Sequence, residues 1–211
     1  MILPSDIHTH RPDLHPNAII SVSPDRFMPE PHRYYSVGIH PWQSAGTTPH
    51  EMELLEQIAS HPQVVAIGEC GIDRLRGAST ERQAEILAAH ISLSEKVQKP
   101  LILHIVRAYD LLLQIRKHAH PRQRWILHGF RGNAATAQQL TKAGCDLSYG
   151  ERYQPAALQA TGLDRLWIES DESLLPYDTL LAQVAQDYPC TTALLQASIT
   201  HRMKEVFFSE I

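Results

Sequence analysis

The stretch VVAIGECGID, residues 64–73, joins a short apolar run to an end that carries a carboxylate. Residues 64–67 are continuously apolar, which is typical of a strand buried on both faces of a parallel sheet. Glu69 follows this run after one glycine, so a group that can bind a metal or accept a proton stands at the end of the strand. The same arrangement recurs on both sides of this stretch.

Apolar runs alternate with helical stretches over most of the chain. Helical spacing predicts helices at residues 51–60, 80–98, 108–118, 133–143, 177–186 and 191–208. Ser79 is placed to cap the second of these, and Gly144 to end the fourth. The apolar runs predict strands at residues 17–22, 34–39, 64–67, 101–103, 124–127, 145–149 and 166–168, with a short one at 7–10. This alternation implies βαβ units and a parallel sheet.

About eight predicted strands favour an α/β fold that closes into a compact (β/α)8 TIM barrel. The 211 residues lie near the lower limit of that fold, roughly 200 residues. Between His10 and Tyr34 there is one predicted strand and no room for ordinary helices on both sides of it. We therefore expect the first helices to be shortened or missing, in a single domain over residues 1–211. A doubly wound open sheet is the alternative, because periodicity does not show whether a sheet closes.

The composition argues against several classes of protein. Hydrophobic residues make up 43% of the chain and the net charge is −4, without the basic stripe of a protein that holds long nucleic acid by charge. Three cysteines, an odd number, fit no zinc or disulfide framework. No signal peptide and no apolar run of membrane-spanning length is visible. We expect a cytoplasmic protein with reduced cysteines that neither associates with a membrane nor needs an obligate protein partner. The sequence leaves the oligomeric state open.

Metal-compatible side chains end most of the predicted strands. Asp6, His8 and His10 alternate along the first strand and therefore project to one face. In a barrel the strand ends converge on one mouth, where a divalent cation would compensate the carboxylates. The other residues of this kind are His40, Glu69, His104, His128 and Asp171.

Each of these residues has an ordinary structural explanation when it is taken alone. His104 and His128 could be hydrogen-bonded rim histidines, and Asp171 could be a helix N-cap. Such residues at the ends of several separate strands are hard to obtain as an accident of packing. Imidazole and carboxylate ligands together suit Zn²⁺, Mn²⁺, Fe²⁺ or Co²⁺, while Mg²⁺ prefers oxygen. Two such ions could share one carboxylate and activate a water.

These motifs, in this order, resemble the TatD-related metal-dependent hydrolases, which belong to the amidohydrolase-like barrels. The resemblance covers nearly the whole chain, and GECGID is its most specific part. The matching segments are HTH (8–10), GIHP (38–41), AIGECGID (66–73), His104, HGFRG (128–132) and ESD (169–171).

The resemblance implies a hydrolase with one or two divalent metal ions (Mg, Mn, Zn, Fe or Co). The usual activity of the family is that of a deoxyribonuclease, which cleaves phosphodiester bonds, often from a 3′ end. It implies that His8 and His10 bind the first metal with Asp171, that Glu69 bridges, and that His104 and His128 bind the second. Asp171 would also take the proton of the attacking water, and His40 would face the substrate phosphate.

The departures from the family pattern fall on the substrate rim. Trp42 replaces a residue that is commonly histidine, and Arg131 and Glu172 stand where the family has other residues. The arginine expected two residues after His104 is shifted to Arg107. Arg107 and Arg131 are candidates for binding phosphate, or are solvated loop charges. Trp42 could stack on a base of a single-stranded substrate, or be a partly buried rim residue.

The first functional hypothesis is therefore a metal-dependent hydrolase, most simply a deoxyribonuclease that acts on DNA ends or another phosphodiester substrate. The alternative is an amidohydrolase that cuts a small amide or lactone with the same metals. A third hypothesis is a metal-binding homologue that has lost activity.

Overall fold

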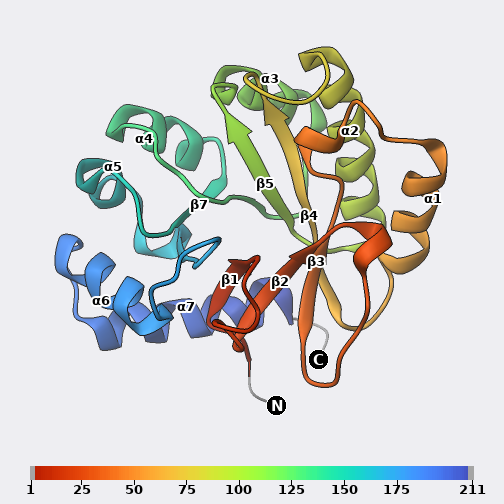
Figure 1. Ribbon diagram of the computed structural model, residues 1–211. Coiled ribbons are helices and arrows are strands. Elements are labelled where there is room, and N and C mark those ends of the chain that lie inside the picture. The colour runs from red at the N-terminus through yellow and green to blue at the C-terminus, as the bar shows by residue number, and fades with distance from the viewer. Residues whose placement is uncertain (1–2, 209–211) are drawn as a thin grey trace. The chain divides into compact units, whose positions relative to one another are not determined.

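Eight parallel strands form the sheet of the computed structural model, which describes residues 3–208 (Figure 1). The strands are β1 (Asp6–Thr9), β2 (Ala18–Val22), β3 (Tyr34–Val37), β4 (Val64–Asp73), β5 (Leu101–Val106), β6 (Trp125–Leu127), β7 (Cys145–Tyr149) and β8 (Leu166–Ile168). The helices are α1 (Pro49–Ile58), α2 (Thr80–Val97), α3 (Tyr109–Ala119), α4 (Ala134–Lys142), α5 (Pro155–Gln159), α6 (Tyr177–Asp187) and α7 (Thr192–Phe207). Strands and helices alternate from β3 onward, as the sequence predicts.

The chain divides into two compact units, one formed by residues 21–125 and the other by the residues before and after them. In the unit of residues 21–125, β3, β4 and β5 pair in parallel and in chain order, with Ile67 opposite Leu101. Figure 1 shows β4 and β5 side by side, with α2 packed along β4.

In the other unit, β7 pairs with β8 and β1 pairs with β2, all in parallel. A bridge between Thr9 and Asp171 joins β1 to the segment that follows β8. The strand order in each unit is therefore the chain order, with β1 following β8.

The predicted elements agree with the structure, apart from their ends and one short helix. No helix lies between β1 and β2, and a single 3-10 turn (Pro24–Arg26) lies between β2 and β3, so the expected loss of the first helices is found in the described chain. Helix α1 begins at Pro49, two residues before the predicted start, because Thr48 and Glu51 form a capping box ahead of it. The sequence analysis did not predict α5.

Strand β4 continues through GECGID to Asp73, beyond the predicted end at Ile67, and all ten of its residues are buried. The prediction followed the apolar run of residues 64–67, and glycine, which comes next, is disfavoured in strands. Here Gly38 and Gly68 allow two backbones to meet. A Cβ on Gly38 would lie 2.6 Å from the Gly68 Cα, and a Cβ on Gly68 would collide with the Ile102 carbonyl. This close approach sets Glu69 beside the end of β3.

A membrane-spanning helix needs a long and uniformly apolar stretch, and no helix within residues 3–208 has one. The cytoplasmic location and the single domain over residues 1–211 stay predictions.

Another histidine, His90 of α2, is fully buried and joins α2 to the end of β3. Its Nε2 accepts a hydrogen bond from the Ile39 backbone N–H at 3.0 Å, and its Nδ1 donates to the Ile86 carbonyl at 2.8 Å. Burial lowers the pKa of His90 from 6.5 to about 4, although the Ile86 carbonyl acts in the opposite direction. The imidazole is therefore neutral in the folded protein and fixes the backbone next to His40.

The first prediction concerns the close approach of Gly38 to β4. Gly38→Ala should lower the free energy of unfolding by about 1–3 kcal/mol, because the added methyl group must push two backbones apart. Gly46→Ala is the matched control, since a Cβ there meets nothing closer than the Gln43 carbonyl oxygen at 3.8 Å. Urea denaturation of both variants measures the difference, and equal stabilities would contradict the packing argument.

The second prediction concerns the pH dependence that follows from His90. Below about pH 6.5 the unfolded chain binds a proton at this residue that the folded chain does not, so stability falls as the pH falls toward 4. The free energy of unfolding should decrease between pH 7 and about pH 4.5 in the unmodified protein. In His90→Gln this decrease should be smaller, by on the order of 2–3 kcal/mol. Denaturation at several pH values checks this, with exposed His50→Gln as the control. An unchanged slope for His90→Gln would show that His90 is not buried as a neutral group.

Candidate functional site

The ends of β1, β6 and β8 bring His8, His128 and Asp171 together in the unit formed by the two ends of the chain. One ligand atom from each of these residues lies within 4.8 Å of the other two. The His8 Nε2 atom is 3.8 Å from Asp171 Oδ1, and the rings of His8 and His128 are 4.3 Å apart. His10 is more exposed, with its Nε2 atom 3.9 Å from the same Asp171 oxygen. These are four of the residues that the sequence analysis named as metal ligands, and we call them the first cluster.

Backbone hydrogen bonds hold Asp171 against β1. The Asp171 N–H donates to the His8 carbonyl at 2.9 Å, and the His10 N–H donates to the Asp171 carbonyl at 3.0 Å. Asp171 has a φ of 51°, in the left-handed region that Asp tolerates better than most residues. Its carboxylate is thereby fixed beside the histidines of β1.

Glu169, two residues earlier, lies behind His128. Its Oε1 atom accepts from the Gly129 N–H at 2.6 Å and is 3.4 Å from His128 Nδ1. Burial on its own would raise the pKa of Glu169, but His128 and His8 outweigh that effect and hold the pKa below its usual value. A charged carboxylate behind an imidazole fixes the orientation of the ring, as the partners of metal-binding histidines do. The sequence analysis placed Glu169 at a strand end without assigning it a role.

A pocket of about 240 Å³ is lined by Asp171, Glu169 and the arginines Arg131 and Arg152. Arg131 was a predicted phosphate contact, whereas Arg152 was missed. Both are exposed, and the Arg131 carbonyl accepts a hydrogen bond from Gln154 Nε2. The pocket therefore offers two cationic side chains beside the first cluster.

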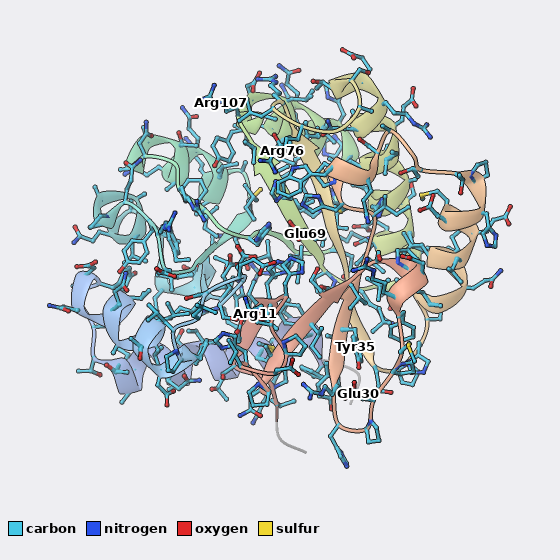
Figure 2. The ribbon with its side chains drawn as sticks, in the orientation of Figure 1. Arg11, Glu30, Tyr35, Glu69, Arg76 and Arg107 are labelled. Carbon is cyan, nitrogen blue, oxygen red and sulfur yellow. The ribbon has the colours of Figure 1, made fainter. Side chains whose placement is uncertain are left out.

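A second cluster lies in the unit of residues 21–125, where His40 follows β3, Glu69 lies within β4 and His104 lies within β5. Glu69 has 4% of its surface exposed, and its Oε1 atom is 3.1 Å from His40 Nε2 and 2.8 Å from His104 Nδ1. His40 was predicted to face the substrate phosphate, and the structure places it among the possible ligands. Arg107 is exposed beyond β5, with its carbonyl bonded to Arg74. Figure 2 shows Glu69 within β4, and Arg76 and Arg107 farther along, toward the end to which β4 and β5 run.

Asp73 closes the second cluster from the far end of β4. Its Oδ2 atom is 3.6 Å from His104 Nε2 and accepts from Trp42 Nε1 at 2.6 Å. Burial would raise the pKa of Asp73, but the bonds from the Trp42 indole and the Leu75 N–H, together with His104, lower it overall. No role was predicted for Asp73. Its even spacing from Glu69 in a strand would have indicated that the two share a face.

Both clusters fit a divalent cation by their chemistry. Each combines imidazole nitrogens with a carboxylate oxygen. Within 4.8 Å of one another lie one ligand atom each of His8, His128 and Asp171 in the first cluster, and one each of His40, Glu69 and His104 in the second. In the second cluster a buried carboxylate lies between two imidazoles, a donor set that positive charge stabilises. Which residues hold which ion, including a bridging role for Glu69, stays a prediction.

Comparisons with known proteins agree with these observations. The family profile described as TatD related DNase matches residues 28–205. The chain belongs to the TatD-related DNase family. It is a TatD-family metal-dependent hydrolase, as its motifs predicted.

Two relatives show the extent of the sequence similarity. The uncharacterized metal-dependent hydrolase TatD of Mycobacterium tuberculosis is 32% identical, over 82% of this chain and 71% of that protein. The 3′-5′ ssDNA/RNA exonuclease TatD of Klebsiella pneumoniae is 32% identical, over 68% of this chain and 59% of that protein. The chain thus spans about three fifths of the length of the second relative.

Solved structures show the fold. The TatD homologue YJJV of Escherichia coli K12 matches 98% of this chain and 99% of its own, with a TM-score of 0.81 at 19% identity. A TatD-family hydrolase of Entamoeba histolytica matches with a TM-score of 0.76 at 13% identity. The predicted TIM-type barrel of eight parallel strands, with fewer helices than usual, is confirmed, and the open doubly wound sheet was the wrong alternative.

A third prediction tests the two clusters as metal sites. His128→Ala and His104→Ala should each reduce the amount of Mn²⁺ bound by purified protein, and the double variant should reduce it further, because each change removes one ligand from a different cluster. Elemental analysis and calorimetric titration measure this. His50→Ala, an exposed residue of α1, is the control. Full metal binding by both single variants would refute the assignment.

Proposed function

We propose that this protein is a divalent-metal-dependent nuclease that hydrolyses phosphodiester bonds at the ends of DNA. The observation that carries the proposal is the pair of clusters at the strand ends, His8–His128–Asp171 and His40–Glu69–His104. The exonuclease named among the relatives acts on single-stranded DNA and RNA, which favours phosphodiester substrates for this chain as well.

The roles proposed for the residues follow from their positions. His8, His10, His128 and Asp171 would hold one cation, and Glu69 and His104, with His40 beside them, would hold another. Bound cations would supply positive charge to the phosphoryl oxygens and acidify the attacking water.

Asp171 is the proposed proton acceptor. Its side chain keeps 28% of its surface exposed, while His8 and Glu169 are almost completely buried, so it is the carboxylate of the first cluster that substrate and water reach. Its backbone is fixed by β1, so the carboxylate is pre-positioned to take the proton of the attacking water at an Oδ atom.

Charge on the rim supports a substrate that is short or single-stranded. The net charge of −4 gives no general attraction for long nucleic acid. Arg131 lines the pocket of Asp171, which places it to bind a phosphate close to the first cluster. Arg107 is exposed beyond β5 and is the second candidate for binding phosphate.

The substrate panel that tests the function has two arms. Mn²⁺- or Mg²⁺-loaded protein is incubated with single-stranded DNA labelled at either end, and separately with amides and lactones. Shortening of the DNA that stops when the metal is chelated supports the proposal. Cleavage of amides or lactones with intact DNA would instead identify an amidohydrolase, and no turnover of any substrate with metal bound would identify an inactive homologue.

A fourth prediction assigns the proton acceptor. Asp171→Asn should reduce kcat on single-stranded DNA by on the order of 10²–10⁴, because the amide cannot take the proton. Asp164→Asn is the control, since Asp164 is an exposed carboxylate outside both clusters. Wild-type kcat in Asp171→Asn would remove Asp171 from the mechanism.

A further inference from the structure

Trp42 is a half-exposed indole at the edge of the second cluster. It follows His40 and Pro41 in a 3-10 turn, and 49% of its surface is exposed. Its ring lies edge-on to the His40 ring at 4.8 Å and to the His104 ring at 5.8 Å. The two other tryptophans of the chain, Trp125 and Trp167, are completely buried. Trp42 is therefore the one tryptophan of the chain whose ring a ligand can reach from solvent.

The indole is held in one orientation by polar contacts. Trp42 Nε1 donates to Asp73 Oδ2 at 2.6 Å, and the Trp42 backbone N–H donates to His40 Nδ1 at 3.1 Å. Asp73, which accepts the hydrogen bond from the indole, is itself held in place. Asp73 is buried, and the Gln83 amide accepts from its N–H at 2.7 Å and donates to its carbonyl at 3.0 Å. The aromatic face is thus fixed before any ligand arrives.

Arg76 supplies a positive charge to the same place. Its guanidinium lies over the Trp42 ring, 4.4 Å from the centroid. Arg76 is exposed and forms no ion pair with any residue between 3 and 208, whereas its neighbour Arg74 is paired with Asp110 at 2.8 Å. Its hydrogen-bond donors are therefore not committed to a carboxylate of the described chain. Figure 2 shows Arg76 on the side of the sheet toward which β4 runs, beyond Glu69.

We propose that Trp42 and Arg76 form a stacking platform that takes an unpaired nucleobase of the substrate next to the second cluster. This inference rests on the proposed nuclease function and names single-stranded nucleic acid as the substrate class. An aromatic face and a guanidinium plane both stack on any base, and the guanidinium also donates to phosphate. Bases in a duplex are stacked on each other, so the platform selects frayed or single-stranded ends without reading sequence.

The first test uses the fluorescence of Trp42 without turnover. Because Trp125 and Trp167 are buried, a base that stacks on the protein surface should quench chiefly the emission of Trp42. Metal-loaded protein is titrated with a nuclease-resistant phosphorothioate oligothymidine, and with a phosphorothioate of the same length made of abasic sugars. Saturable quenching by the first, weak quenching by the second and loss of the signal in Trp42→Phe support the platform. Equal quenching by both oligonucleotides overturns it.

The second test uses cleavage of DNA with and without bases. Trp42→Ala should raise KM for single-stranded DNA on the order of 10-fold and raise KM for abasic DNA much less, because only the first substrate has bases to stack. Trp42→Phe, which keeps an aromatic face, should recover most of the loss, and Arg76→Ala should act in the same direction as Trp42→Ala. Leu75→Ala is the control, because Leu75 is an exposed apolar residue next to Arg76 in the chain.

The outcomes separate this inference from the proposed function. If DNA is cut but Trp42→Ala weakens both substrates equally, Trp42 is a structural residue and the platform is wrong. If no DNA is cut but oligothymidine still quenches Trp42 more than the abasic chain, the platform stands and the nuclease proposal fails.

Discussion

A carboxylate that is almost completely buried within strand β4 is the constraint on which this structure depends. Glu69 keeps 4% of its surface exposed and lies between the imidazoles of His40 and His104. A buried charge of this kind is stable only with compensating partners. The close approach of Gly38 to Gly68 brings the His40 turn to Glu69. The glycines of the GIHP and GEC motifs therefore help to place His40 beside this carboxylate.

The first cluster meets the same constraint by different means. Glu169 is buried behind His128, while the more exposed Asp171 is held by hydrogen bonds to the backbone of β1. Each unit of the chain therefore carries its own set of imidazoles and carboxylates, built on strand ends. In each set a buried carboxylate, Glu169 or Glu69, lies against a histidine and orients it. In the first set Asp171 is more exposed and stays within reach of solvent. This division of roles suits metal binding and proton transfer.

The sequence predicted the parallel strands and the missing first helices, and it singled out the histidines and carboxylates that the structure brings together in the two clusters, because periodicity and strand-end chemistry are local signals. It did not predict that β4 runs on to Asp73, since the strand was predicted from the apolar run of residues 64–67 and the continuation depends on close contacts with neighbouring backbones. It also gave no role to His90, Asp73 or Glu169. Their roles depend on contacts with residues far away in the chain, and a single sequence does not contain those distances.

The central claim is that each of the two clusters binds a divalent metal ion. Crystals grown with Mn²⁺ and measured at the manganese absorption edge would locate the ions by anomalous scattering. The account predicts peaks within about 2.0–2.3 Å of ligand atoms of His8, His128 and Asp171, and of Glu69 and His104. Manganese bound elsewhere, with neither cluster occupied at saturating metal, would contradict it.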